Sequence, residues 1–342
     1  MARQSTPRAK RLRRGDIAML KSLTTTLALA IAAGPASVNA SGLPYPSRPI
    51  TFVLPYPAGG ASDSLTRAMA EEMGKKLGQP VIVENRPGAA GAIGTNYAAK
   101  APADGYTVLV TLTQSILNNQ LLFSKLPYDT RKDLAFISEL FTGNVVLVVN
   151  QSLPVKNVKE LLEYCAQNKG TYGSWGIGSY AHLAGSFLGQ SRNLNLTHVP
   201  YKGEAPELQD IIGGQLTFAF GSIGGTRPFV AAGKLRALAV SGEQRMKGLP
   251  NVPTFAEAGL NGLEFKPNGS VVMMAPIATP APILARLEQE ARAAVDTPPV
   301  RARLQTYGLE PLGTDARRAR ENYDALYPVQ ERLIKLTGAK LD

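Results

Sequence analysis

The chain has 342 residues, of which 44% are hydrophobic, and it carries a formal net charge of +11. This length and composition predict two domains with ordinary cores rather than one. The single cysteine, Cys165, excludes an internal disulfide, and one cysteine with two histidines leaves too few ligands for a structural zinc or a catalytic Cys/His pair. We therefore expect no metal site.

Residues 1–40 have the layout of a secretory signal peptide. Seven Lys/Arg residues precede the apolar run LTTTLALAIAAGPASVNA, and Val38 and Ala40 are the small residues before cleavage. The run is too short to span a bilayer. Met19 is an alternative start, and Arg13 and Arg14 leave twin-arginine export open, although the following GDIAM fits such a signal poorly. We expect export to the periplasm.

Much of the positive charge belongs to this leader. Without residues 1–40, the chain keeps 30 Lys/Arg and 25 Asp/Glu residues, a net charge of +5. The remainder has no Lys/Arg cluster interleaved with aromatic residues, which argues against a nucleic-acid partner. A mild positive excess suits an anionic ligand.

After the leader, strands alternate with helices. Periodicity and turn residues predict a strand at 50–57, a helix at 64–78 ended by Gly78, a strand at 80–86, a glycine-rich loop at 87–94, a helix at 95–101 and a strand at 107–112. A second series has strands at 145–150, 196–201, 216–222 and 235–241, and helices at 155–170, 180–193, 205–215 and 226–234. This alternation indicates parallel βαβ units.

From residue 269 the pattern changes to a strand, a proline-rich turn and two charged helices, 283–295 and 316–338. These helices have no sheet of their own, so we expect them to pack on the first domain. The fold class is therefore α/β with two lobes: 41–145 with 268–342, and 146–267. The chain crosses near 143–150 and returns near 265–271; two adjacent crossings make a hinge, and the ligand site is expected between the lobes.

Three segments have the composition of anion-receiving loops at helix starts, where N–H groups are unpaired. In the first, glycines permit close approach and Ser62 or Asp63 is placed to cap the following helix; for Asp63 a simple capping role is an equal alternative. In the second, Trp175 offers an apolar wall, and His182 is more often a satisfied helix residue than a ligand contact. In the third, Lys202 is alternatively a solvated loop charge. The candidates are Ala58, Gly59, Gly60, Ala61, Ser62 and Asp63; Trp175, Gly176, Gly178, Ser179, Tyr180 and His182; and Tyr201, Lys202 and Gly203.

Other motifs fit less well. Gly88, Gly91 and Gly94 approach a dinucleotide-binding turn, but the spacing is one residue off and no acidic residue follows a strand where ribose would need it. No Gly-x-Ser-x-Gly elbow is present, and no His and Asp accompany Ser179 in the order that a hydrolase uses. His198 falls in a predicted buried strand and is interpreted as structural. We expect no cofactor and no catalytic residue.

Taken together, these segments resemble the Bug family, the substrate-binding proteins of tripartite tricarboxylate transporters. The resemblance rests on residues 45–109, HVPYKGEAPELQDIIGGQ, GKLRALAVSGEQR, LPNVPTFAEAGL and APIATPAPILARL, and covers nearly the whole mature chain. It implies a two-lobed periplasmic-binding-protein (Venus-flytrap) fold, and a carboxylate held mainly by backbone amides and bridging waters. It also implies delivery of that carboxylate to a membrane permease.

The resemblance places the first binding loop at residues 58–63 and the second at 176–182, with 201–203 nearby. Residues 111–115 follow a first-lobe strand and are expected to border the cleft, with Thr113 and Gln114 as candidates. The chain departs from the family at Thr217 and Gly221, where many members have acidic residues, and at Trp175, where proline or a small residue is frequent. These departures concern ligand identity and leave the fold class unchanged.

Two functions follow from the sequence. The first is a monomeric receptor that binds a small carboxylate for uptake or sensing, with permease subunits as partners or as an orphan without them. The second is a periplasmic enzyme that acts on a small organic acid. An aligned nucleophile and base would separate the two, and the sequence contains none. Backbone amides recognise a carboxylate without specifying its substituents, so the sequence leaves the acid open.

Overall fold

The computed structural model describes residues 45–242, 244–246, 248–265 and 269–341. The predicted signal peptide, residues 1–40, lies outside the described residues. Pro46–Asp342 form a unit of their own. No described helix has both the length and the apolar character that crossing a bilayer requires.

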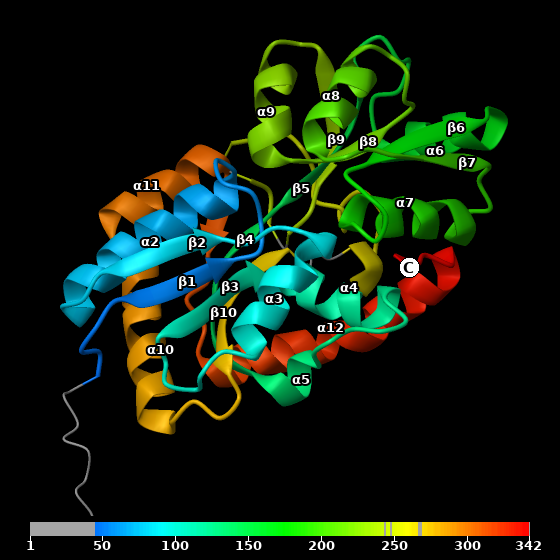
Figure 1. Cartoon of the computed structure of the whole chain (residues 1–342). Helices are drawn as coiled ribbons and strands as arrows, with labels where there is room; N and C mark the ends of the chain where they lie inside the picture. The colour runs from blue at the N-terminus through cyan, green and yellow to red at the C-terminus, as the bar shows by residue number, and fades with distance from the viewer. Residues whose placement is uncertain (1–44, 243, 247, 266–268, 342) are drawn as a thin grey trace, which may run out of the picture. The chain divides into compact units, whose positions relative to one another are not determined.

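The first lobe is built on a six-stranded sheet (Figure 1). Its strand order is β11-β4-β10-β3-β1-β2, with β1 at Ile50–Leu54, β2 at Val81–Asn85, β3 at Thr107–Leu112, β4 at Leu134–Gly143, β10 at Ser270–Pro276 and β11 at Leu309–Pro311. Strands β1, β2 and β3 are parallel, whereas β10 runs antiparallel to β3 and β4. The prediction of parallel units is therefore confirmed for β1, β2 and β3, and the antiparallel β10 joins them where the chain returns to this sheet.

Helices cover both faces of this sheet. They are α2 at Ala61–Leu77, α3 at Ala92–Ala99, α4 at Thr113–Leu122 and the single turn α5 at Thr130–Asp133, with a 3-10 turn, η1, at Ala89–Gly91. The predicted stop at Gly78 is confirmed: this residue adopts φ 70°, a left-handed conformation that favours glycine. Alternate strand residues face opposite sides, so Val53 and Leu109 pack with α3, α4 and the C-terminal helix.

The second lobe contains two smaller sheets. Strands β5 (Val145–Asn150), β8 (Ala219–Ser222) and β9 (Leu235–Val240) pair antiparallel in the order β8-β5-β9. The prediction of parallel units is wrong for these three strands, because β5, which enters from the first lobe, runs opposite to both of its neighbours. Strands β6 (Gly170–Ser174) and β7 (Leu196–Pro200) are parallel, and a bridge between Tyr172 and Phe218 links β6 to the segment that enters β8. Its helices are α6 at Val158–Gln167, α7 at Tyr180–Ser191, α8 at Glu204–Ile212 and α9 at Ile223–Ala231, with a 3-10 turn, η2, at Leu263–Phe265.

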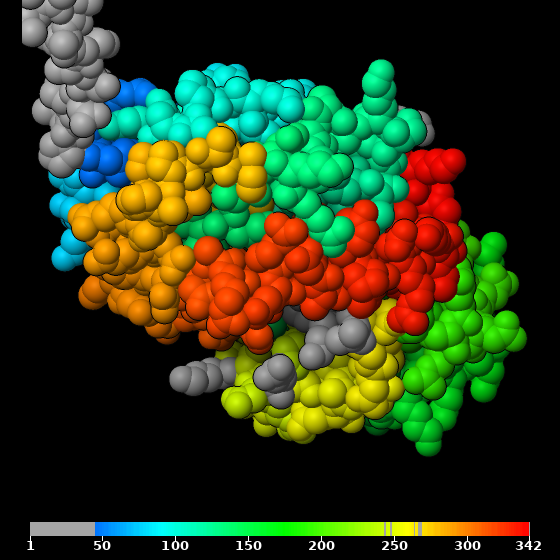
Figure 2. Space-filling model, turned by 90° about the horizontal axis from the view of Figure 1, so that it is seen from below, coloured from blue at the N-terminus to red at the C-terminus, as the bar shows by residue number. Residues whose placement is uncertain are grey.

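The C-terminal segment contains three helices, not the two that the sequence predicted. They are α10 at Ala281–Val295, α11 at Pro298–Tyr307 and α12 at Ala316–Thr337. The additional helix, α11, begins at two prolines and ends at Gly308. Helices α10 and α11 contact α2, and α12 contacts β4 and α4. Figure 2 shows this orange-to-red segment across one face of the molecule.

Helix α12 also contacts α7 of the second lobe. The contact is apolar: Leu122 and Leu183 join Val329, Leu333 and Ile334 in one buried cluster. The C-terminal helix therefore ties α4 of the first lobe to α7 of the second.

Candidate ligand-binding site

The first candidate loop, residues 58–63, joins β1 to α2. Helix α2 begins after Gly60, and no side chain caps its start. The predicted capping by Ser62 or Asp63 is therefore wrong, because both residues lie inside the first turn. Since the first N–H groups of a helix have no partner within it, this start is open to an external acceptor. Ala58, Gly59 and Gly60 are exposed, and Ala61 and Ser62 are half-buried.

The carboxylate of Asp63 holds this loop in place. It accepts hydrogen bonds from the Gly59 N–H (3.0 Å), Asn85 Nδ2 (3.0 Å) and Arg67 Nε (3.1 Å). Burial by itself raises the pKa of Asp63, but the hydrogen bonds from Arg67, Gly59 and Asn85 and the charge of Arg67 outweigh it and lower the pKa to about 2. The side chain is buried and its oxygens are satisfied by its own lobe, so Asp63 positions the loop rather than contacting a ligand.

Helix α4 begins directly after β3, and the start has no side-chain cap. Tyr56, just before the first loop, connects it to this helix: its hydroxyl bonds to Thr111 Oγ1 (3.0 Å) and Ser115 Oγ (2.9 Å). The same oxygen accepts the Leu112 N–H at 3.0 Å. Sequence analysis did not identify Tyr56, because an aromatic residue between two prolines gives no sign of this role.

The predicted site residues Thr113 and Gln114 point in different directions. Thr113 is buried, and its hydroxyl bonds to Ser270 Oγ of β10 at 2.7 Å, so its side chain is directed into the sheet and only its backbone N–H, at the start of α4, is left for a ligand. Gln114 Nε2 lies 3.4 Å from the carbonyl oxygen of Gly178 in the second lobe. Asn118, one helical turn further, donates to the same oxygen at 2.8 Å. Asn118 was not predicted.

The second candidate loop, residues 174–182, runs from β6 into α7. Ser179 is the N-cap of α7, and its Oγ accepts the His182 N–H at 3.3 Å. Gly178 has φ 77° and packs so closely on Leu122 that an added Cβ would lie 2.4 Å from Leu122 Cδ1. A glycine is therefore required where the two lobes touch. Trp175 is half-buried and packs against the second-lobe core.

Two predicted contacts of this loop face the interior instead. Tyr180 is buried and donates its hydroxyl to the Phe265 carbonyl at 2.9 Å; burial raises its pKa above the ordinary value. The Nδ1 atom of His182 accepts the Gly178 N–H at 3.1 Å. His182 therefore supports the backbone of the loop, and the structural alternative that the sequence left open fits the geometry better than a ligand contact does.

The third candidate loop, residues 201–203, lies beside the second. Tyr201 N–H donates to the Ser174 carbonyl at 2.8 Å, and Tyr201 Oη donates to Asp210 Oδ2 at 2.6 Å. Gly203 is the N-cap of α8. Lys202 is exposed and makes no hydrogen bond or ion pair with the residues that the structure describes, so it is the one candidate cation available to a ligand in this loop.

The three candidate loops are thus linked in series, through helix α4 and the second loop. The first loop connects through Tyr56 to the start of α4, α4 bonds to Gly178 through Gln114 and Asn118, and the second loop continues against Tyr201. Among the described residues, no hydrogen bond joins the first loop directly to the second. The arrangement leaves helix starts with unpaired N–H groups near the lobe contact.

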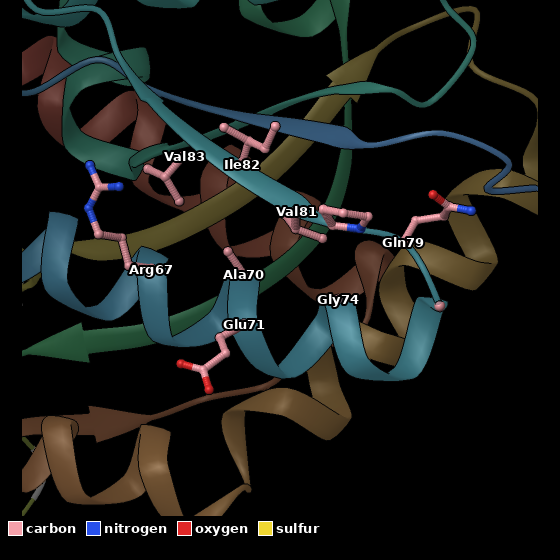
Figure 3. Close-up of a pocket in the computed structure, with 10 residues that line it drawn as sticks. Arg67, Ala70, Glu71, Gly74, Gln79, Val81, Ile82 and Val83 are labelled. Carbon is pink, nitrogen blue, oxygen red and sulfur yellow. The ribbon is translucent and has the colours of Figure 1, made fainter.

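A hollow elsewhere on the surface is less suited to binding a polar ligand. It lies between α2 and the edge strand β2, as Figure 3 shows, and is lined largely by backbone and apolar side chains such as Val81 and Ile82. Its charged residues are already paired, Arg67 with Asp63 and Glu71 with Lys75. No group of three or more His, Cys, Asp or Glu residues within the described part of the chain has the geometry to hold a metal ion.

Two α/β lobes in contact, with open helix starts near that contact, place the chain in the class of two-lobed solute-binding proteins. Residues 65–336 match the family described as the tripartite tricarboxylate transporter family receptor, and the chain belongs to this family. The resemblance that the sequence indicated and the predicted fold class are confirmed.

Several relatives are similar over most of their length. A UPF0065 protein from the tcbD-tcbE intergenic region of Pseudomonas sp. (strain P51) is 34% identical over 302 residues, 87% of this chain and 89% of the relative. The BugT protein of Bordetella pertussis is 31% identical over 322 residues, 93% and 98% of the two chains.

Solved structures agree. The periplasmic binding protein BugD is 31% identical with a TM-score of 0.72, covering 86% of this chain and 99% of its own. An R. palustris protein solved with adipate is 30% identical with a TM-score of 0.75, and the match covers 87% of this chain and 99% of that protein. MatC from Rhodopseudomonas palustris, solved with bound malate, is 29% identical with a TM-score of 0.71, and the match covers 85% of this chain and 100% of MatC.

Proposed function

We propose that this chain is a periplasmic receptor that binds a small carboxylate between its two lobes, for delivery to membrane permease subunits. The site consists of the exposed part of the first loop, the start of α4 and the second and third loops. The observation that carries the proposal is the pair of helix starts without side-chain caps, at Gly60 and Leu112, beside a loop that the other lobe supplies.

The relatives support a carboxylate as ligand. Their solved complexes contain adipate and malate, both dicarboxylic acids. In this chain the open N–H groups and the positive ends of α2 and α4 are suited to one carboxylate group. A charge-assisted hydrogen bond contributes roughly 1.5–3 kcal/mol. Several such bonds therefore supply the about 8 kcal/mol that micromolar binding needs.

We assign the lobes to 41–145 with 268–342, and to 146–267, as the sequence predicted. Support comes from the sheets: β4 ends at Gly143 in the six-stranded sheet and β5 of the second lobe begins at Val145, so the crossing falls one residue before the predicted boundary. The return is from β9 of the second lobe to β10 of the six-stranded sheet, which begins at Ser270. Closure about these two crossings brings α7 against α4, which makes the Asn118–Gly178 bond a contact of the closed form.

The enzyme alternative has one feature in its favour, the hydrogen bond between Ser174 Oγ and His198 Nε2 at 2.7 Å. However, Ser174 is fully buried, and its Oγ also bonds with the backbone of Gly176. No described carboxylate bonds to His198. A nucleophile must reach its substrate, so this pair fits a structural role, and we propose that the chain binds its ligand without converting it.

Native mass spectrometry of the protein purified from the periplasm tests the proposal. A small organic acid should co-purify in one copy per chain, and calorimetry with the identified acid should give a dissociation constant near or below micromolar. The protein should behave as a monomer of the sequence that begins after about residue 40. Conversion of the bound acid into a product, or the absence of any carboxylate ligand, would contradict the receptor function.

A further inference from the structure

One carboxylate lies at the start of α9, a helix that sequence analysis did not connect with the site. Ser222 is the N-cap of α9, and its Oγ accepts the Gly225 N–H at 3.0 Å. Both the N–H and the Oγ of Ser222 donate to the carboxylate of Glu204, the hydroxyl at 2.9 Å. Glu204 is itself the first residue of α8.

The surrounding glycines make room for this carboxylate. A Cβ added to Gly225 would lie 2.7 Å from Glu204 Oε1, and one added to Gly221 would lie 3.2 Å from the same oxygen. A side chain at Gly225 would therefore displace the carboxylate from its present position. The position of Glu204 is thus built into the chain by residues of β8 and α9 that are far from it in sequence.

Glu204 compensates the positive ends of two helices at once. The start of a helix carries roughly half a positive charge, and Glu204 is in the first turn of α8 and bonded to the start of α9. No Lys or Arg of the described residues forms an ion pair with it. These two helix starts are therefore already occupied by an anion that belongs to the protein.

A second carboxyl group, that of Glu207, lies near Glu204. Glu207 is fully buried, and neither of its oxygens has a hydrogen-bond partner among the described residues. Burial first, and the charge of Glu204 second, raise its pKa to about 8. The charge of Glu204, the smaller of these two causes, acts in the same direction on any other anion placed beside it.

The start of α9 lies where the second lobe meets helix α11 of the first. Across the lobe contact, an added Cβ on Gly224 would lie 3.1 Å from the carbonyl oxygen of Tyr307, at the end of α11. Helix α11 in turn reaches the first turn of α2, where Arg303 donates to Ser64 Oγ at 2.8 Å. Glu204 also follows the third candidate loop directly. A carboxylate of the second lobe therefore adjoins the third candidate loop, while the open helix starts belong to the first lobe.

We propose, on the basis of the receptor function above, that Glu204 makes this receptor select a monocarboxylate with a hydrogen-bond-donating group, above all an ammonium group, at its other end. The ligand carboxylate binds the starts of α2 and α4, and the ammonium group binds near Glu204. A second carboxylate at that end is repelled by Glu204 and finds no open helix start at α9. Lys202 attracts such a group, but it is exposed, so solvent screens its charge more than that of the half-buried Glu204.

Matched ligand pairs test this directly by calorimetry on the full mature chain. Succinate and 4-aminobutanoate, and adipate and 6-aminohexanoate, differ only in the group at one end. The wild-type protein should bind the amino member of the better-fitting pair at least about tenfold more tightly than the dicarboxylate. This comparison needs no variant and therefore does not depend on the folding of one.

Glu204→Gln then identifies the residue responsible. The amide oxygen of glutamine still accepts the Ser222 N–H, so the start of α9 stays capped while the charge is removed. The variant should lose the preference: the ratio of the two affinities in a pair should fall by about tenfold, so that both ligands bind about equally. Glu163→Gln, which removes an exposed charge from α6 of the same lobe, should keep the preference of the wild type.

The results separate this inference from the function on which it rests. Equal or tighter binding of the dicarboxylate by the wild type, or an unchanged preference in folded Glu204→Gln, overturns the role of Glu204 and leaves a carboxylate receptor. Absence of binding of every carboxylate, including any that co-purifies, overturns the receptor function itself.

Discussion

The imidazole rings of His182 and His198 are stacked, with centroids 4.1 Å apart and planes inclined by 17°. The ring of Tyr172 in turn stacks on that of His198, with centroids 5.0 Å apart. His182 Nδ1 accepts the Gly178 N–H, and His198 Nε2 bonds to Ser174 Oγ. The second candidate loop is thus held at both ends by histidines, and His182 must remain neutral at Nδ1 to accept its bond.

Stability should consequently fall in mild acid. Burial lowers the pKa of His182, and burial together with the charge of His182 lowers that of His198 from 6.5 to about 4. Because the folded state favours the neutral rings, their contribution is complete above pH 6.5 and is lost as the pH falls towards 4. We expect a loss of roughly 1–2 kcal/mol for His198 after allowing for its partial exposure.

Thermal unfolding measured between pH 7 and pH 4 checks this. His198→Gln, which can still bond to Ser174, should flatten the pH dependence in this window. Asp63, with its pKa of about 2, loses its contribution only between 3.8 and 2, below the window. A melting temperature that is constant from pH 6.5 to 4, or a variant as pH-sensitive as the wild type, would refute the role of the pair.

Glu207 predicts the opposite dependence on pH. Its pKa is about 8 in the folded state and 4.5 in the unfolded chain, so ionisation favours unfolding as the pH rises above 4.5. Glu207→Gln should therefore raise the stability at pH 8, by on the order of 2–4 kcal/mol, and change it little at pH 4. Chemical denaturation at the two pH values measures the difference, with Glu163→Gln as an exposed control. A variant equally stabilised, or destabilised, at both pH values would contradict the expectation.

The sequence predicted most of the elements but not all of their boundaries. Strand β4 was missed because only Asn144 separates it from β5, so that no turn signal divides two apolar runs. Helix α4 follows β3 without a glycine or proline, and its polar residues Asn118 and Asn119 are buried in the fold. Both elements are defined by tertiary contacts that periodicity does not record.

The site was likewise predicted in part, in its loops but not in the directions of its side chains. Composition located the loops, since glycine and hydroxyl residues at helix starts are a local signal. It could not tell which way a side chain points, so Thr113 and Tyr180 were placed in the site although they bond to Ser270 and Phe265. The Glu204–Ser222 contact was missed because it joins residues 18 positions apart through the packing of α8 on α9.

Gly60 offers a test of the first loop that does not disturb the fold. Its φ of −81° suits any residue, and a Cβ added there has no atom within 4 Å. Gly60→Val should therefore leave the melting temperature nearly unchanged but lower ligand affinity by about tenfold or more, because the isopropyl group occupies the space of the bound carboxylate. Gly60→Ala, the smaller matched change, should lower affinity less. Unchanged affinity in Gly60→Val would place the ligand elsewhere.

Trp175 is the only tryptophan of the chain and reports on the second loop. It is half-buried against the second-lobe core. Rearrangement of this loop on ligand binding should therefore change the polarity of the surroundings of the indole ring. We expect a shift in the emission maximum that follows the calorimetric binding curve. Trp175→Phe should lose the signal while ligand binding remains measurable by calorimetry. Saturation with a bound ligand and no change in emission would argue against a ligand at the second loop.

The hydrogen bond from Asn118 to the Gly178 carbonyl predicts a measurable contribution to closure. It is the shorter of the two bonds that α4 makes to this oxygen, 2.8 Å against 3.4 Å for Gln114. Asn118→Leu keeps the number and branching of the side-chain heavy atoms but removes the donor, which should destabilise the closed form by about 1 kcal/mol and weaken ligand binding about fivefold. Because closure follows capture, the loss should lie mainly in a faster dissociation rate, measured by stopped-flow fluorescence. Gln120→Leu, on the same helix but bonded to Thr130 within the first lobe, should leave the dissociation rate unchanged. If Asn118→Leu dissociates at the wild-type rate, the contact between α4 and Gly178 does not hold the closed form, and closure must depend instead on the apolar cluster of α7 and α12.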